Sequence, residues 1–293
     1  MKYLVGCAYR VTEGQTTAMI PPIVNNFVAG ESYEEALEHV HELNDRNVAG
    51  ILNLLGEHYD EREAATADTE EYVALVEEIA TRDIDACVSV KPSQLGLEIS
   101  DTVFQSNLAR IIDAAECFVW IDMEDHTTTD VTLDAFEKHT RETDGNVGVC
   151  IQANLHRTGS DLERLAELPG KVRLTKGAYD EPAEIAHTNS ETIDAVYRDQ
   201  LEFAFREFDD GVAVGSHDPE MIAHARELHE TYGTPYEIQM LTGVRERAQF
   251  ELASEVPVYQ YVPYGTKWFS YFYRRLRERK SNALFAARAI LGR

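Results

Sequence analysis

The segment 173–182 combines cationic side chains with small residues at a point where a strand would end. Apolar and polar residues alternate over 172–175, which is the period of a β-strand, and Lys176, Gly177 and Ala178 follow directly. The two small residues leave room beside the backbone, and Arg173 and Lys176 could attract an anionic ligand. The pattern therefore predicts a ligand site at a strand tip. A surface turn with two solvated cations is the alternative.

A second candidate site lies near the carboxyl terminus. Tyr271, Arg274, Arg275 and Glu278 have the spacing of one face of a predicted helix. Paired arginines can bind a carboxylate with two hydrogen bonds each, while a tyrosine ring packs on the rest of the ligand. The alternative is a terminal helix whose arginines interact with the helix dipole and pair with surface acids.

The elements that would position these residues recur with a regular spacing. Eight short β-branched or alternating runs are separated by charged stretches with helical periodicity. The runs are residues 48–55, 86–91, 118–123, 147–153, 172–176, 212–216, 236–241 and 258–262. Eight strand–helix repeats predict an α/β fold of the (βα)8 TIM barrel type, in one domain over residues 1–293. The alternative, a doubly wound open sheet, usually has a glycine-rich turn after its first strand, and Leu54-Leu55-Gly56-Glu57 lacks one.

Helical spacing of apolar residues predicts helices over 68–82, 102–116, 132–143 and 189–208. A further helix begins after Ser32, because Ser32 and Glu35 have the spacing of a capping box, and it ends near Asn44.

Each predicted strand ends in a polar residue. These residues are Glu57, Lys91, Asp122, Gln152, Arg173 with Lys176, His217, Gln239 and Tyr261. Active sites of (βα)8 barrels lie at the carboxyl ends of the strands. The ring of polar residues therefore predicts a common active-site mouth.

The charge balance limits the partners. Lys and Arg number 27 against 52 Asp and Glu, so the net charge is −25. Such a protein would repel nucleic acid, and an anionic substrate would need a local cationic pocket. The low lysine content together with many acids predicts a halophilic protein in a high-salt cytoplasm, with an ordinary acidic cytosolic protein as the alternative.

The cysteines and the hydropathy bear on the cellular compartment. Cys7, Cys87, Cys117 and Cys150 are scattered without metal-binding spacing, which predicts a reducing environment and no metal. No stretch approaches the roughly 20 apolar residues of a spanning helix, and no signal peptide is apparent. We therefore expect a cytoplasmic protein.

From about Asn26 to Asn282 the chain resembles the proline dehydrogenase family of FAD-dependent enzymes. The most specific motifs are Arg173-Leu174-Thr175-Lys176-Gly177-Ala178-Tyr179 and the helix with Tyr271, Arg274, Arg275 and Glu278. Weaker motifs include Leu54-Leu55-Gly56-Glu57, Ile121-Asp122-Met123-Glu124, Gly215-Ser216-His217-Asp218 and Gln239-Met240-Leu241. The chain departs from the usual pattern at Pro92 and Ser93, where Leu-Thr is more common, and at Thr175, where valine is more common.

The resemblance implies a distorted barrel, with FAD across the strand ends and a C-terminal helix carrying the substrate-binding arginine pair. It implies that Asp122 and Arg173 are catalytic, with Arg173 near the flavin N5. It implies a substrate site formed by Lys91, Arg274, Arg275, Tyr261, Tyr271, Leu174 and Tyr179. Cofactor contacts would come from Met123, Gln152, Arg173, Lys176, Gly177, Ala178, Ser216 and His217, and a gate from Leu55 and Glu57.

The implied reaction oxidises L-proline to 1-pyrroline-5-carboxylate by hydride transfer to the flavin. The cofactor would carry out the electron chemistry, and the protein would position the substrate and disfavour a protonated amine. The resemblance also implies a quinone-type electron acceptor at the membrane surface, with peripheral membrane contact, and a separate pyrroline-5-carboxylate dehydrogenase acting on the product.

Three alternatives stay open. A Schiff-base lyase could use Lys91 or Lys176 on the same barrel. A dehydrogenase could prefer hydroxyproline, because one hydroxyl changes few contacts. A non-catalytic proline-binding protein could use the same scaffold.

Overall fold

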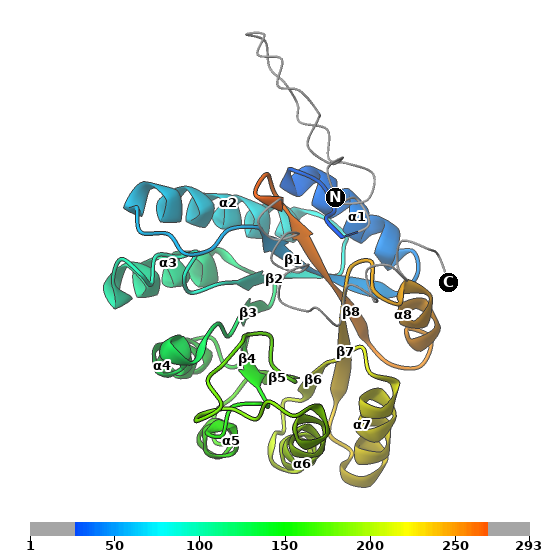
Figure 1. The fold of residues 1–293 in the computed structure, drawn as a ribbon. Helices are drawn as coiled ribbons and strands as arrows, with labels where there is room; N and C mark the ends of the chain where they lie inside the picture. The colour runs from blue at the N-terminus through cyan, green and yellow to red at the C-terminus, as the bar shows by residue number, and fades with distance from the viewer. Residues whose placement is uncertain (1–26, 269–293) are drawn as a thin grey trace, which may run out of the picture.

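The computed structural model describes residues 27–268, and within them eight parallel strands close into a barrel (Figure 1). The strands are β1(Val48–Leu54), β2(Ala86–Val90), β3(Val119–Ile121), β4(Val147–Gln152), β5(Lys171–Thr175), β6(Val212–Gly215), β7(Tyr236–Leu241) and β8(Val258–Tyr264). Each strand pairs with the next one along the chain, and β8 closes the ring on β1, from Val48 opposite Val258 to Leu54 opposite Tyr264. The closed order confirms the predicted barrel over the described residues and excludes the open sheet.

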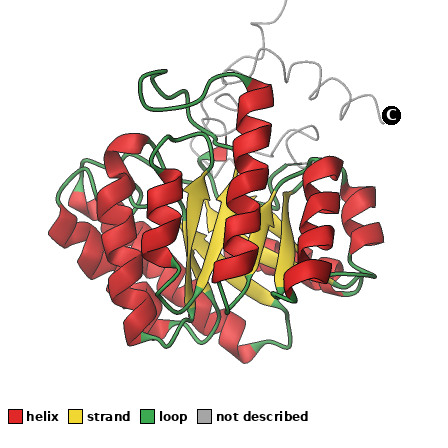
Figure 2. Ribbon diagram, turned by 90° about the horizontal axis from the view of Figure 1, so that it is seen from below, coloured by secondary structure: helices red, strands yellow, loops and turns green. Residues whose placement is uncertain are grey.

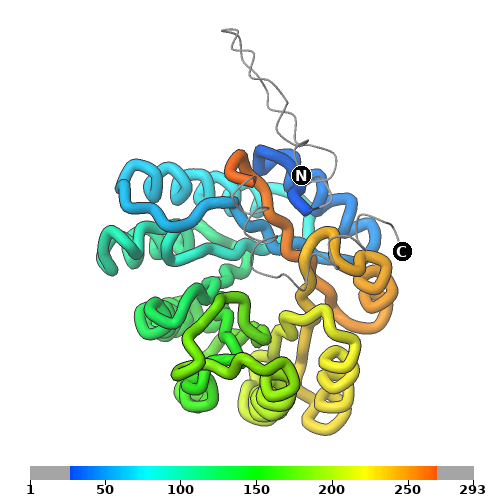
Figure 3. The backbone as a smooth tube through the Cα atoms, in the orientation of Figure 1, coloured from blue at the N-terminus to red at the C-terminus, as the bar shows by residue number. Residues whose placement is uncertain are grey.

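Helices surround the strands, as a side view shows (Figure 2), and the chain winds around the barrel in sequence order (Figure 3). They are α1(Tyr33–Asn44), α2(Arg62–Thr81), α3(Asp101–Ala114), the 3-10 helix η1(His126–Thr128), α4(Thr129–Glu142), α5(Thr158–Leu165), α6(Ser190–Glu207), α7(Pro219–Tyr232) and α8(Glu246–Leu252). The sequence predicted α1, α2, α3, α4 and α6, and it did not name α5, α7 and α8. Among the helices of the described residues, none is long and apolar enough to cross a membrane.

Helix starts follow from their caps. The predicted capping box of α1 is confirmed, because the Glu35 backbone donates to the Ser32 hydroxyl and the Ser32 backbone donates to the Glu35 carboxylate. Helix α7 begins with Asp218 as its cap and Pro219 in its first turn. This Asp-Pro pair is a start signal that was present in the sequence.

Alternation along the strands separates two apolar layers. The larger layer lies between the strands and the helices, and a smaller one fills the barrel with Ile51, Cys87, Trp120 and Ala213. At the amino-terminal end of the barrel, Lys171 pairs with the buried carboxylate of Glu237 at 2.8 Å. The opposite, carboxyl-terminal end carries the polar residues that the sequence predicted. Tyr271, Arg274, Arg275 and Glu278 lie outside the described residues.

Candidate active site

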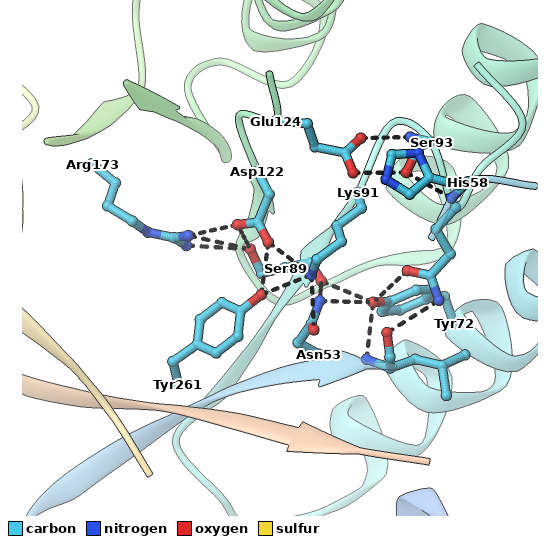
Figure 4. Close-up of polar contacts among 12 residues, drawn as sticks. Asn53, His58, Tyr72, Ser89, Lys91, Ser93, Asp122, Glu124, Arg173 and Tyr261 are labelled. Carbon is cyan, nitrogen blue, oxygen red and sulfur yellow. Dashed lines mark hydrogen bonds and ion pairs between the residues drawn. The ribbon is translucent and has the colours of Figure 1, made fainter. Parts of the chain in front are cut away.

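Three predicted residues meet around the carboxylate of a fourth, Asp122, at the carboxyl ends of the strands (Figure 4). Asp122 Oδ2 accepts a hydrogen bond from Tyr261 at 2.6 Å and one from Lys91 Nζ at 3.1 Å. Its other oxygen accepts bonds at 2.7 Å from Arg173 and from Ser89. We call Lys91, Asp122, Arg173 and Tyr261 the Asp122 cluster.

Strand alternation explains how the Asp122 cluster forms. Arg173 is central in β5 and points into the barrel, where its guanidinium carbon lies 4.6 Å from the centre of the Trp120 ring. Trp120 therefore supports the buried guanidinium from below the mouth, in a favourable cation–π arrangement. Trp120 and Ser89 are not among the predicted site residues. Both stand two residues before a predicted site residue, which is the spacing of residues on the same face of a strand.

Lys91 is fully engaged with protein groups. Its ammonium donates to Asn53 Oδ1 at 2.9 Å and to the Tyr261 hydroxyl at 3.1 Å, in addition to Asp122. An ammonium has three hydrogens, so these three acceptors use all of them. Asn53 is itself fixed, because its amide donates to the Ser89 carbonyl at 2.8 Å. Asn53 is not among the predicted site residues, although it lies on the inward face of β1, two residues after Ile51.

The ionisation of the Asp122 cluster follows from its charges. Burial alone would raise the pKa of Asp122, but Lys91 and Arg173 outweigh it and hold that pKa well below its usual range. Burial alone would lower the pKa of Lys91 and of Arg173, and the Asp122 carboxylate outweighs it and raises both. Two cations and one anion give the cluster one net positive charge within a strongly acidic protein.

A second group of predicted residues forms the wall beside β4 and β5. Gln152 is buried, its amide donates to the Glu124 carbonyl at 2.8 Å, and its side-chain oxygen accepts the Ala178 N–H at 3.0 Å. Gln152 thereby fixes the turn that contains Gly177 and Ala178. Lys176 pairs with Asp194 at 2.5 Å and with Asp218 at 2.7 Å, so its charge is already shared between two carboxylates.

The predicted residues after β6 and β7 are also in place. Ser216 is buried, and its hydroxyl accepts the Asp218 N–H at 3.2 Å. His217 Nε2 accepts the Leu241 N–H at 3.3 Å, and this ties the ends of β6 and β7 together. Between Arg173 and Gln239, the inner positions of β6 are Ala213 and Gly215, which leave that side of the mouth with little side-chain bulk.

Several buried polar atoms lack partners among residues 27–268, and two of them belong to the strands on either side of β6. These two are Arg173 Nε, a donor, and Gln239 Oε1, an acceptor, since the Gln239 amide already donates to Glu237 at 2.7 Å. Buried polar groups are normally hydrogen-bonded, so a ligand with both donors and acceptors fits here. A flavin ring has such an edge. The unpartnered donor of Arg173 and the unpartnered acceptor of Gln239 stand on either side of the small inner residues of β6, and we conclude that the residues present fit a flavin.

Gly177 is required by its conformation. Its φ of +124° is one that side chains rarely adopt, and an added Cβ would lie 2.3 Å from Asn154 Oδ1. We expect Gly177→Ala to destabilise the protein by about 1–3 kcal/mol and to lower its flavin content, because the turn beside Ala178 must shift. Thermal unfolding and absorbance at fixed protein concentration measure both effects. Gly159→Ala is the control: it lies in α5 with nothing within 4 Å of the added Cβ, and it should stabilise the helix by about 0.5–1 kcal/mol. Equal flavin content in the two variants would contradict the prediction.

The Leu174 side chain, which the sequence predicts to border the substrate, does not join the Asp122 cluster in this structure. Arg173 points into the barrel, so its neighbour Leu174 points outward, where it is fully buried in the layer beneath the helices. The Met123 side chain packs in the same layer, away from the Asp122 cluster. Leu241 is the apolar residue at the inner end of β7, opposite Tyr261 of β8. The Thr175 hydroxyl, which had no assigned role, donates to the Ile151 carbonyl at 3.2 Å.

The predicted gate lies at the start of the β1–α2 connection. Leu55 and Val28 form a small buried cluster, and Phe27 and Trp268 pack against it. Glu57 follows on the rim and is half-buried. Tyr179 is half-buried on the opposite connection, close enough to Lys91 for its phenol to add to the rise of the Lys91 pKa. The structure thus brings the described members of the predicted site to one end of the barrel, except for the Leu174 and Met123 side chains.

Comparison with known proteins agrees with this geometry. A family model described as proline dehydrogenase matches residues 36–288. Proline dehydrogenase 1 of Bacillus subtilis is 34% identical over 272 residues, which cover 90% of this chain and 89% of the relative. Proline dehydrogenase of Deinococcus radiodurans is 35% identical over 280 residues, covering 92% of this chain and 90% of the relative.

Solved structures support the fold. Proline utilization A from Bdellovibrio bacteriovorus, inactivated by N-propargylglycine, superposes with a TM-score of 0.81 at 23% identity over 90% of this chain. Proline utilization A from Corynebacterium freiburgense gives a TM-score of 0.77 at 22% identity over 91% of this chain. The match covers 34% and 32% of those longer chains. Together with the family model and the two curated relatives, these findings show that the chain belongs to the proline dehydrogenase family.

Proposed function

We propose that this protein uses FAD to oxidise L-proline to 1-pyrroline-5-carboxylate. The observation that carries the proposal is the Asp122 cluster, a buried and net positive group at the barrel mouth of a proline dehydrogenase family member. When bound, the flavin would accept a hydride from the ring carbon beside the proline nitrogen. The protein's task is then to hold a small, rigid, anionic ring in one orientation.

The carboxylate of proline would be held by two kinds of cation. All three hydrogens of Lys91 have acceptors in the described residues, so Lys91 would act mainly through its charge, or would exchange Tyr261 for the substrate. Arg274 and Arg275, which lie outside the described residues, would supply the bidentate hydrogen bonds that the sequence predicts. Tyr261, Tyr271, Tyr179 and Leu241 would enclose the ring.

Proline must lose its ammonium proton before a hydride can leave. The excess positive charge of the Asp122 cluster disfavours a second ammonium beside it, so bound proline would release its proton more readily than free proline does. Asp122 does not serve as the base in this proposal, because its lowered pKa makes it a weak proton acceptor. Its role is to keep Lys91 and Arg173 charged and in place.

The cofactor would rest on the wall formed by β4, β5 and β6. Gln152, Arg173, Lys176, Gly177, Ala178, Ser216 and His217 are the residues that we propose hold it, with Met123 contributing through its backbone. Arg173 Nε and Gln239 Oε1 would gain partners from it. A cation in this position favours a negatively charged reduced ring, and Arg173 supplies one.

The remaining proposals concern the surroundings of the reaction. Glu57 and Leu55 would close over the substrate, with Glu57 pairing with Arg274. Electrons would pass to a quinone-type acceptor at the membrane surface. We propose a cytoplasmic location for the protein, with peripheral contact at the membrane. A separate dehydrogenase would consume the 1-pyrroline-5-carboxylate. We also propose that residues 1–293 form a single domain.

The Schiff-base lyase is disfavoured by the state of its two candidate lysines. A Schiff base requires a neutral amine, and strong ion pairing keeps both lysines protonated. The pKa of Lys91 is raised because the Asp122 carboxylate outweighs its burial. The pKa of Lys176 is raised in the same way, against its burial, by Asp194 and Asp218.

An anaerobic spectral titration tests the proposed function. The purified protein should be yellow, and stoichiometric L-proline should bleach the flavin absorbance; a parallel titration with hydroxyproline measures the preference between the two substrates. Turnover with an artificial electron acceptor would exclude the non-catalytic binding protein. A colourless protein that takes up no FAD, or a flavoprotein that proline does not reduce, would contradict the proposal.

A further inference from the structure

A second polar cluster joins the ends of the same strands, just outside the Asp122 cluster (Figure 4). The Glu124 side chain is buried, and each of its oxygens accepts one hydrogen bond of 2.7 Å from Ser93, one from the backbone N–H and one from the hydroxyl. The Ser93 hydroxyl also accepts the His58 N–H at 3.0 Å. We call Ser93, Glu124 and His58 the Ser93 clamp.

Every polar group of Ser93 contributes to this connection. Besides the bonds to Glu124 and His58, its carbonyl accepts the Tyr59 N–H at 3.2 Å. His58 has a φ of +56°, a conformation that non-glycine residues disfavour, so its backbone must be held by its surroundings. The His58 ring adds a third anchor through Glu98 of the β2–α3 connection.

The segment held by the Ser93 clamp carries Glu57. On the other side of Glu57, the Leu55 N–H donates to the Tyr264 carbonyl of β8 at 2.7 Å. Gly56 leaves little room for movement between these anchors, because an added Cβ would lie 2.2 Å from the Tyr59 hydroxyl and 2.6 Å from Asp68. Gly56 and Glu57 therefore form a two-residue span that is fixed by β8 at one end and by Ser93 at the other.

We propose that Ser93 is a positioning residue for Glu57, and that the Ser93 clamp sets the orientation in which Glu57 closes the substrate site. The proposal rests on the proposed function, in which Glu57 pairs with Arg274 over bound proline. Glu124 stands two residues after Asp122, and Ser93 stands two residues after Lys91. The strand ends that form the charged site are thus the same ones that hold its rim.

Loss of the Ser93 hydroxyl should weaken substrate binding more than chemistry. Ser93→Ala removes the hydroxyl that bonds to one oxygen of the buried Glu124 and to the His58 N–H. His58 can then leave its disfavoured backbone conformation, because one of its anchors is lost. We expect the KM for L-proline to rise about five- to thirty-fold while kcat changes by less than about three-fold. Flavin content should not change, because Ser93 hydrogen-bonds to Glu124, His58 and Tyr59, and none of these is a proposed cofactor residue.

The test compares four proteins: wild type, Ser93→Ala, Ser93→Thr and Thr132→Val. Threonine keeps the hydroxyl and should restore the KM. Thr132 supplies a matched control, because its hydroxyl is also buried and donates to the Thr128 carbonyl, one turn earlier at the start of α4. Kinetics and calorimetric affinity for a proline analogue that lacks the ring nitrogen give two independent readouts. Equal losses in Ser93→Ala and Ser93→Thr, or a loss of kcat without a change of KM, would overturn the proposal.

A double-mutant cycle with Glu57→Gln separates positioning from general destabilisation. If Ser93 acts through Glu57, then Ser93→Ala should raise the KM by less than about two-fold in the Glu57→Gln background. Full additivity of the two changes would refute the proposal. If Ser93→Ala does not fold, Glu124→Gln serves in the same cycle, because its amide places a donor against the Ser93 donors. A wild type without proline turnover would instead refute the proposed function.

Discussion

Asp122→Asn is expected to lower kcat/KM for L-proline by at least about 100-fold, because removing one partner of a buried ion pair typically costs about 3–5 kcal/mol. Four donors converge on Asp122: Lys91, Tyr261, Arg173 and Ser89. An amide can accept at only one end, so its NH2 group would face donors. Two buried cations would also lose the anion that holds them together. Steady-state kinetics with thermal unfolding and flavin content measure the result.

Asp161→Asn is the matched control for Asp122→Asn. Asp161 is also a buried aspartate, and it pairs with Arg157 at 2.8 Å, but it lies on α5 outside the barrel. The Asp161→Asn variant should have a lower stability and a kcat/KM within about two-fold of wild type, because Asp161 belongs to α5 on the outside of the barrel. A similar loss of kcat/KM in the two variants would show that Asp122 acts only through stability.

The pH dependence of stability gives a second readout for Asp122→Asn. The folded-state pKa of Asp122 is lowered, so its stabilising contribution is complete above the ordinary value of 3.8 and is lost as the pH falls toward the folded-state pKa. The difference in melting temperature between wild type and Asp122→Asn should therefore be constant above about pH 5 and shrink below pH 3.8. A difference that grows on acidification would contradict the ionisation state assigned here.

Lys91→Met should raise the KM for L-proline at least about 30-fold, because truncating one member of a buried charge pair costs about 2 kcal/mol or more. The change leaves Asp122 paired with Arg173, so the Asp122 cluster becomes neutral and no longer attracts a carboxylate. Stability should fall less than in Asp122→Asn, since each remaining charge keeps a partner. Initial rates over a wide range of proline concentration measure the KM.

Lys171→Met provides a control of the same residue type. Lys171 pairs with the buried Glu237 and lies 5.5 Å from the Phe118 ring centre, as Lys91 pairs with Asp122 and lies 5.8 Å from the Tyr261 ring centre. It is at the amino-terminal end of the barrel, so its loss should affect melting temperature and leave KM unchanged. If Lys171→Met raised the KM as much as Lys91→Met, the effect could not be assigned to the substrate site.

The strands were predictable because a buried parallel strand has a simple pattern. Apolar runs such as 147–153 and 236–241 are bounded by charged stretches, and the structure moves the ends of all eight predicted strands by at most two residues. Helices α5 and α8 span eight and seven residues, too few for a clear helical period. Helix α7 is longer, and its Asp-Pro start could have identified it.

The site was predictable in its charged residues and less so in the residues behind them. Lys91, Asp122 and Arg173 stand at strand ends, where the barrel rule places active sites. Asn53 and Ser89 stand deeper in their strands, and a small polar residue there is as easily explained by packing. Alternation places the Leu174 side chain on the opposite face of β5 from Arg173. The same rule applied from Gln239 points to Leu241.

The closed set of hydrogen bonds around Lys91 has a consequence for how the site responds to its ligand. Lys91, Asn53, Asp122 and Tyr261 orient one another before proline arrives, so their dipoles need little reorganisation energy when the substrate enters or its charge changes. These side chains lose their conformational entropy during folding, before the substrate binds. A rigid five-membered ring therefore binds to a site whose charges and dipoles are already oriented. Flexible acyclic amino acids would lose more conformational entropy on binding there, so they should bind less tightly.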